Sequence, residues 1–234
     1  MRSDVAPMNI ARLKLFHFPM TRSARVKWLL HEILDDDFDV QKVELYEGEQ
    51  YRDDFLAINP NHAVPLLEIS WESGETSSMI ESGAMISWLA DVYEDRGLAP
   101  AAGSCGRERV DYMQMLHFSA SWFDMMLWQL RLHRDLVPPH QRSEAVISTF
   151  TTKIEQEVEP QLIARLEKDG FAAGTRFSAV DCILGHNIRW SRFYDLCGHD
   201  SFTQYLNRLE ERTAYQKAFE DAGSFALKPP SRED

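Results

Sequence analysis

The chain is poor in cysteine: only three of its 234 residues are cysteine, and all three lie in the second half. Cys105, Cys182 and Cys197 form neither a paired framework nor a C-x-x-C motif, which is typical of a reducing compartment. Because the first half carries no thiol, any sulfur chemistry there must come from a ligand. The histidines also lack zinc-ligand spacing, so we expect no metal site.

Long apolar runs and long basic runs are missing as well. No stretch approaches the roughly 18 consecutive apolar residues of a membrane span, and residues 1–7 lack the apolar centre of a secretory signal. The chain has 37 acidic and 25 basic residues, a formal net charge of −12, and no basic run that could follow a phosphate backbone. We therefore expect a soluble, cytoplasmic protein that binds neither membranes nor nucleic acid.

Strand and helix patterns alternate in the first part of the chain. The patterns predict strands over 13–18, 38–45, 64–69 and 75–80, and helices over 21–34, 50–58 and 81–97. We expect the first three strands to pair in parallel through helical crossovers and the last two to form an antiparallel hairpin. This order, with a proline opening the third strand, is the pattern of the thioredoxin fold.

Small and turn-forming residues at 98–106 predict a linker, and helical patterns dominate after it. The expected helices cover about 107–134, 141–168, 179–196 and 201–221. With 44% hydrophobic residues the chain can bury a large core. We therefore predict an α/β thioredoxin-like domain over 12–97 and an all-α domain over 107–222.

The stretch NHAVPLLEI, residues 61–69, places a proline at the start of an apolar strand. Two interpretations are open. Pro65 can simply occupy the first strand position, where its missing N–H costs nothing. Alternatively, Val64–Pro65 is a cis peptide bond, which holds the Val64 backbone open for a ligand.

The motifs NPNHAVP at 59–65 and MIESGAMISWLAD at 79–91 resemble those of the cytosolic glutathione transferases. The resemblance extends from about Leu13 to Ala222 and favours the bacterial, theta-like members of serine or threonine type over the cysteine type. A further match is FSAVD at 177–181, which resembles the capping box that opens a helix in the family's second domain.

The resemblance implies how glutathione would bind. The main chain of Val64, before cis Pro65, would pair with the cysteinyl backbone of the tripeptide, as an added strand does. The Ser82 N–H and hydroxyl would hold the γ-glutamyl carboxylate at a helix N-terminus, with Glu81 orienting the segment. Ser82 could instead be only a helix cap.

Two further side chains are weaker candidates for this site. By position, Gln50 falls where theta-like members reach the glycyl end of glutathione, and His62 falls where they often carry a basic residue. Both could equally be ordinary surface side chains.

The thiol of glutathione must ionise to react, and at pH 7 only about 3% of a thiol of ordinary pKa is ionised. The family places a hydroxyl donor for the thiolate between the first strand and helix, where FPMTRSARV contains Thr21 and Ser23. Matching Arg25 and Val26 to the corresponding region of theta-like and zeta-like members favours Thr21. Ser23, or a backbone N–H with neither hydroxyl involved, is an alternative, and either hydroxyl could be an N-cap. A cysteine is missing there, which disfavours the thiol-reductase and isomerase roles of other classes.

The second substrate is expected in the helical domain, where residues 112–130 are rich in methionine and aromatic side chains. Most of these could be core. We predict a hydrophobic electrophile pocket lined by Phe118, Trp122 and Met126, spaced four apart, together with Phe18 and Met20 from the first domain.

The resemblance thus predicts a homodimeric enzyme that conjugates glutathione, as co-substrate and with no other cofactor, to a small hydrophobic electrophile. Two alternatives are a glutathione-dependent peroxidase or disulfide reductase, and a non-enzymatic binding module on the same fold.

Overall fold

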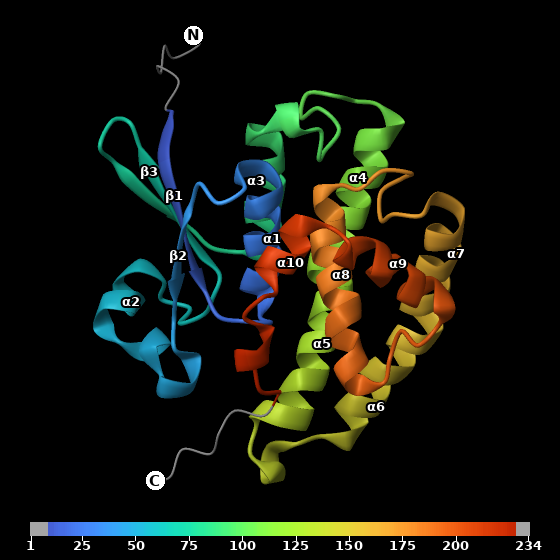
Figure 1. Ribbon diagram of the computed structural model, residues 1–234. Helices are drawn as coiled ribbons and strands as arrows, with labels where there is room; N and C mark the ends of the chain where they lie inside the picture. The colour runs from blue at the N-terminus through green and yellow to red at the C-terminus, as the bar shows by residue number, and fades with distance from the viewer. Residues whose placement is uncertain (1–8, 228–234) are drawn as a thin grey trace.

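The computed structural model describes residues 9–227, which form a small mixed sheet beside a larger group of helices (Figure 1). The four strands are β1 (Ile10–His17), β2 (Asp39–Lys42), β3 (Leu66–Trp71) and β4 (Thr76–Met79). Their order in the sheet is β2-β1-β3-β4. A thioredoxin-like sheet followed by a helical region, as predicted from the sequence, is therefore confirmed.

The pairing of the strands corrects one expectation. β1 and β2 are parallel and β3 and β4 are antiparallel, as expected, but β1 and β3 are antiparallel as well. Between β2 and β3 the chain holds only two 3-10 turns, Leu45–Glu47 and Glu49–Tyr51, and the short helix α2 (Asp53–Ile58). These remain at one end of the sheet (Figure 1). The chain therefore enters β3 at the end where it left β2, which makes the pairing antiparallel.

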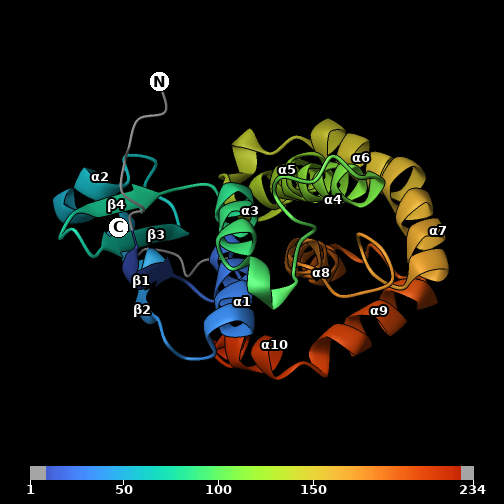
Figure 2. The same cartoon turned by 90° about the horizontal axis from the view of Figure 1, so that it is seen from above.

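Helices α1 (Arg22–Leu34) and α3 (Ser82–Val92) lie between the sheet and the remaining helices (Figure 2). α1 is covered on both sides, because every residue from 23 to 30 is buried. A helix in this position must bury its polar side chains along with its apolar ones, so Ser23 and Arg25 need hydrogen-bond partners inside the protein.

The second half is helical throughout the part that the structure describes, apart from an isolated bridge between Phe171 and Gly174. Its helices are α4 (Arg107–His117), α5 (Asp124–Arg131), α6 (Glu144–Lys153), α7 (Glu159–Asp169), α8 (Ala179–Ser191), α9 (Asp200–Glu210) and α10 (Thr213–Ala218). α8 is buried along most of its length. The boundaries 12–97 and 107–222 of the two domains remain predictions.

The capping box at the start of α8 is confirmed. The Asp181 carboxylate accepts from the backbone N–H of Ser178 at 2.8 Å and from its hydroxyl at 3.0 Å. The next residue, Ala179, donates its N–H to the Leu98 carbonyl at 2.8 Å. This motif therefore anchors the central helix to the segment between the sheet and the helical half.

Within residues 9–227 there is no helix that combines the length and the apolar character needed to cross a membrane.

Candidate active site

The turn between β1 and α1 presents a threonine hydroxyl at the start of a helix. Thr21 is the N-cap of α1, and its side-chain oxygen accepts from the Ser23 N–H at 3.4 Å. Its hydroxyl can donate to the Phe18 carbonyl or to Ser23 Oγ, each 2.8 Å away. Thr21 is only partly buried. Its proton can therefore also turn toward a ligand that approaches the free N–H groups of the helix.

Ser23 lies behind Thr21 and is 0% exposed. Its Oγ is 2.7 Å from Nδ1 of His17, and Nε2 of His17 is 3.0 Å from Asp221. Burial lowers the pKa of His17, although Asp221 opposes the shift, and the imidazole is neutral at neutral pH. Because a carboxylate only accepts, Nε2 carries the proton and Nδ1 accepts from Ser23. The Ser23 proton is thus engaged, and Thr21 is the better placed donor to a ligand.

The Val64–Pro65 peptide bond lies close to the same turn. It is cis, as the second interpretation of the sequence expects. The next residue, Leu66, begins β3 and pairs with Phe16, one residue before β1 ends. This register places Val64 beside the chain that leads into Thr21. Since Val64 precedes the strand, its main chain can pair with an extended peptide.

The second predicted motif starts α3. Glu81 has a φ of +71°, in a region that is uncommon for residues other than glycine and recurs at functional sites. Ser82 follows as the first helical residue and is 3% exposed. Arg25 donates to Ser82 Oγ from Nε at 3.0 Å and from Nη2 at 2.6 Å. With two donors on its oxygen, Ser82 keeps its own proton to donate to a ligand carboxylate.

Arg25 connects this helix start with the helical half. It lies one turn after Thr21 and donates from Nη1 to Asp124 at 2.7 Å and to Asn187 at 3.2 Å. Arg22 donates to the other oxygen of Asp124 at 2.7 Å. Burial alone would raise the pKa of Asp124, but the two arginines outweigh it and lower the pKa. Two guanidinium groups thus share one carboxylate, with the Glu81 carboxylate as a further negative charge near Arg25.

An aromatic pocket opens next to Thr21. Its walls are formed by Met20, Thr21, Arg22, Trp128, Arg131, His186, Trp190, Phe193 and Phe225. Met20 has a φ of +58°, and Nε2 of His186 donates to its carbonyl at 3.2 Å. Burial lowers the pKa of His186 to about 4, so the ring is neutral. His186 therefore fixes the residue before Thr21 and is itself part of the pocket wall.

Of the five side chains predicted to line the electrophile pocket, Met20 is the one that lines the pocket next to Thr21. Phe18 is 1% exposed, and its ring packs against Tyr46 with the centroids 4.8 Å apart. It belongs to the core below the turn.

Phe118, Trp122 and Met126 do not line the pocket and do not share one face. Phe118 is half-buried, Trp122 is 43% exposed and Met126 is 0% exposed. The reason is local: residues 118–123 form a π-helical turn, whose wider spacing breaks the four-residue period on which the prediction relied. The pocket instead takes Trp128 from the following α-helix and Trp190 from α8.

Gln50 and His62 lie in the loops between β2 and β3. Gln50 donates from Nε2 to the Leu45 carbonyl at 3.3 Å, while its buried Oε1 has no partner among the described residues. His62 is exposed, and its ring lies 4.9 Å from the ring of Tyr51. Their predicted contacts with glutathione remain predictions.

The protein's own thiols are poorly suited to nucleophilic chemistry near Thr21. Cys182 and Cys197 are buried, and burial raises the pKa of both, that of Cys197 to about 12. Cys105 is exposed but lies in the segment before α4. Among residues 9–227, no three histidine, cysteine, aspartate or glutamate side chains are grouped to hold a metal ion.

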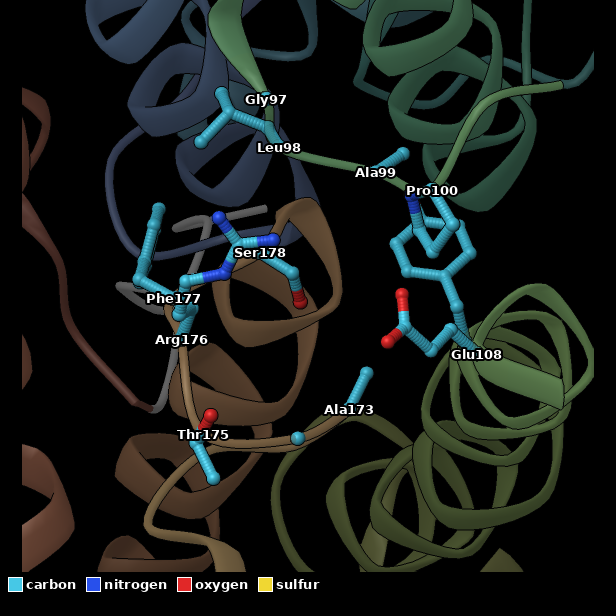
Figure 3. Close-up of a pocket in the computed structure, with 12 residues that line it drawn as sticks. Gly97, Leu98, Ala99, Pro100, Glu108, Ala173, Thr175, Arg176, Phe177 and Ser178 are labelled. Carbon is cyan, nitrogen blue, oxygen red and sulfur yellow. The ribbon is translucent and has the colours of Figure 1, made fainter. Parts of the chain in front are cut away.

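A second cavity, of about 290 Å³, lies between the segment after α3 and the loop before α8. Figure 3 shows Leu98, Ala99 and Pro100 along one side, Thr175 to Ser178 along another, and Glu108 from α4. It shares no lining residue with the pocket at Thr21. Ser178 and Leu98 already take part in starting α8, so we assign this cavity to the junction of the two halves and not to the active site.

Comparison with known proteins gives a family match for the N-terminal part of the chain. Residues 11–91 match the family model of the glutathione S-transferase N-terminal domain. The disulfide-bond oxidoreductase YfcG of Escherichia coli is 28% identical over 216 residues, which cover 88% of this chain and 94% of that protein.

Solved structures resemble the whole described chain. A sphingomonad glutathione S-transferase in complex with glutathione is 27% identical, with a TM-score of 0.74 over 90% of this chain and 98% of that one. The glutathione transferase URE2P6 of Phanerochaete chrysosporium, in complex with oxidised glutathione, shares the fold at 23% identity, with a TM-score of 0.78 over 91% and 97% of the two chains. The fold is thus that of a thioredoxin-like protein with a helical extension. The family match therefore covers residues 11–91, and over the rest of the chain the likeness is to the fold of solved glutathione transferases.

The sequence patterns do not point to several polar residues of the site, namely His17, Arg22, Arg25, Asp124, His186 and Asp221. One signal was available for Arg25. It lies four residues after Thr21, on the same face of a helix that is apolar on most sides, where an unpaired cation would be costly. Asp221 carries no such signal, because only the fold brings it to His17.

Proposed function

We propose that this protein is a glutathione transferase of the serine/threonine type, with Thr21 as the donor that stabilises the glutathione thiolate. One observation carries the proposal: the partly buried Thr21 hydroxyl caps α1, while its neighbour Ser23 is buried, with its hydroxyl within reach of two internal acceptors, Nδ1 of His17 and the Phe18 carbonyl. The tripeptide would pair with Val64 and place its γ-glutamyl carboxylate at Ser82.

The chemistry needs the thiol to ionise near neutral pH. Lowering its pKa by about 2 units requires roughly 2.7 kcal/mol of preferential stabilisation of the anion. A hydroxyl hydrogen bond and a helix N-terminus can supply this together. The thiol proton leaves to solvent, and the sulfur then forms a bond to the electrophilic carbon while the leaving group departs with its electron pair.

Ultraviolet titration of the glutathione thiolate bound to the protein tests this assignment. In wild type we expect a thiol pKa about 2 units below that of free glutathione. Thr21→Ala should move the pKa back toward the free value by the share of the hydroxyl, about 1 unit or more, because that donor is lost while the helix N-terminus remains. Ser23→Ala is the matched control, since it removes a hydroxyl two residues away that does not face the ligand, and it should keep most of the shift.

Two results would contradict the proposal. Loss of the shift in Ser23→Ala alone would transfer the role to Ser23. An unshifted thiol in wild type, with no effect of Thr21→Ala, would favour the non-enzymatic binding module.

A second candidate function is reduction of disulfides by glutathione, which the relation to YfcG favours. With no protein thiol at the turn, glutathione would supply both sulfurs. One glutathione thiolate would displace a thiolate from the substrate disulfide, and a second glutathione would resolve the mixed disulfide, giving glutathione disulfide and the second thiol.

Parallel assays with chlorodinitrobenzene, hydroxyethyl disulfide and cumene hydroperoxide distinguish these activities. Turnover of the aromatic chloride above the uncatalysed rate supports conjugation. Turnover of the disulfide or the hydroperoxide alone supports the second candidate.

The proposal also includes a homodimer and a cytoplasmic location, both implied by the resemblance to the family. Light scattering on the purified protein tests the first. A mass of one chain of 27.1 kDa would contradict it.

A further inference from the structure

The pocket next to Thr21 is cationic as well as aromatic. Its walls include two arginines, Arg22 and Arg131, and no aspartate or glutamate. The chain as a whole carries a formal charge of −12. A cavity with positive groups in a strongly acidic protein has the opposite charge to the protein around it, which favours an anionic ligand over a neutral one.

Arg22 shares its anionic partner with a second arginine. Its guanidinium and that of Arg25 both pair with the Asp124 carboxylate, and Glu81 is a further negative charge near Arg25. The Arg22 guanidinium lies 5.0 Å from the Trp128 ring centroid and 5.4 Å from that of Trp190. Arg22 is thus held at the pocket wall between aromatic rings.

Arg131 lies at the end of α5. Its guanidinium is 5.0 Å from the ring centroid of Phe225, and no carboxylate within residues 9–227 lies within 4.0 Å of it. Arginine recognises carboxylates through two parallel hydrogen bonds. The stacking on Phe225 holds this fork in place for such a ligand.

His186 adds a third polar group to the wall. It is 1% exposed, and because its Nε2 donates to Met20, its Nδ1 is a lone-pair acceptor. Nδ1 is buried and has no partner among the described residues. Because a carboxylate has no proton to donate, this atom cannot bind the anion, and the anionic ligand is inferred from the two arginines alone.

We propose that the second substrate of this enzyme is a planar electrophile that carries a carboxylate or a similar anionic group. The tryptophan and phenylalanine rings would hold its plane, Arg131 and Arg22 would bind the anion, and the reactive carbon would face Thr21. This inference rests on the proposed function and narrows the expectation of a purely hydrophobic electrophile.

Two matched probes test the inference, chlorodinitrobenzoate and its methyl ester, which differ by one negative charge. For each we compare kcat/KM, divided by the uncatalysed rate with glutathione. We expect wild type to favour the acid by about tenfold or more, the value of one charge-assisted hydrogen bond.

Arg131→Gln should abolish this preference, measured as the ratio of kcat/KM for the acid to kcat/KM for the ester within the variant. The matched control is Arg134→Gln. Arg134 is a cation in the following turn that lies over the Tyr194 ring and does not line the pocket, so its variant should keep the preference. Equal rates for the two probes in wild type, or equal losses in both arginine variants, would overturn the inference.

Binding without reaction separates this inference from the proposed function. Dinitrobenzoate and its methyl ester lack the leaving group, and quenching of tryptophan fluorescence reports their binding because Trp128 and Trp190 line the pocket. Suppose that neither chlorodinitrobenzoate nor its methyl ester reacts, but dinitrobenzoate binds at least tenfold tighter than its ester and Arg131→Gln abolishes this difference. The proposed conjugation activity is then contradicted, whereas the proposed anion site is supported. If the ester reacts but the acid has no advantage in either assay, the anion site fails and conjugation stands.

Discussion

The two ends of the candidate cleft are built from different parts of the polypeptide. The proposed glutathione end uses main-chain features: the peptide bond before Pro65, the left-handed residue Glu81 and the start of α3. The proposed second-substrate end uses side chains from α5, α8 and the segment after α10. Main-chain features leave short local motifs in the sequence, whereas a side-chain pocket is assembled from residues scattered over the chain. The features of the first end can therefore be predicted from the sequence, whereas the side chains that line the second end cannot.

Arg25 joins the two ends, and its removal should have the largest effect. Arg25→Met leaves the 4%-exposed Asp124 carboxylate without its buried partner, which should lower the free energy of unfolding by about 3 to 5 kcal/mol. It also removes both donors on Ser82 Oγ, so the KM for glutathione should rise. Urea denaturation and steady-state kinetics measure the two effects.

Arg22→Met is the control for this prediction, because Arg22 pairs with the same carboxylate from a half-buried position. Arg22→Met should lower the free energy of unfolding by about 1 kcal/mol. Arg25→Met combined with Asp124→Leu should recover part of the loss. A double variant no more stable than the single one would show that the buried charge is not the cause.

His186, in the wall of the pocket, should make the stability of the protein depend on pH. Its pKa is about 4 in the folded protein and near 6.5 in the unfolded chain. Because the folded pKa is lowered, the stabilising contribution is complete above about pH 6.5 and is lost as the pH falls toward 4. The loss should be about 3 kcal/mol.

The measurement compares denaturant unfolding of wild type and His186→Gln between those two pH values. Glutamine does not titrate there, and its amide can still donate to the Met20 carbonyl. The difference between the two stability curves should shrink steadily toward the acid side. Parallel curves would mean that His186 is not the titrating group.

The smallest effect on stability and substrate binding is expected where the segment that contains Phe225 forms part of the pocket wall. The Tyr46 hydroxyl donates to the Ala226 carbonyl and accepts from its N–H, each at 2.8 Å, and so fixes the residue after Phe225. Tyr46→Phe should cost about 1 kcal/mol and raise the KM for the second substrate a few-fold, with the KM for glutathione unchanged. Tyr51→Phe, a change at an exposed ring, should alter neither KM, and equal changes in the two variants would contradict the role of Tyr46.

Much of the fold was predictable because helical and strand periodicities and the capping box at Ser178 are local patterns. The parallel pairing expected for β3 was wrong because strand direction depends on where the connection runs. The four-residue period of Phe118, Trp122 and Met126 does not put them on one wall of the pocket at Thr21, because the sequence pattern does not reveal the π-helical turn at 118–123.

The choice between Thr21 and Ser23 could not be made from the sequence for the same reason. Both residues fit an N-cap and both could donate to sulfur. Only the position of His17, which is held by Asp221 from 204 residues away in the chain, engages the Ser23 proton and favours Thr21.

By itself, the sequence determined the order of the secondary elements, the helix start at Ser82 and the turn that contains Thr21, because each depends on residues within a few positions of one another. The tertiary structure alone decided which of the two hydroxyls is buried, which arginine contacts Ser82 and which side chains line the pocket next to Thr21. The physical reason is that burial and hydrogen-bond partners are set by residues from distant segments, which meet only when α1 is enclosed between the sheet and the helices.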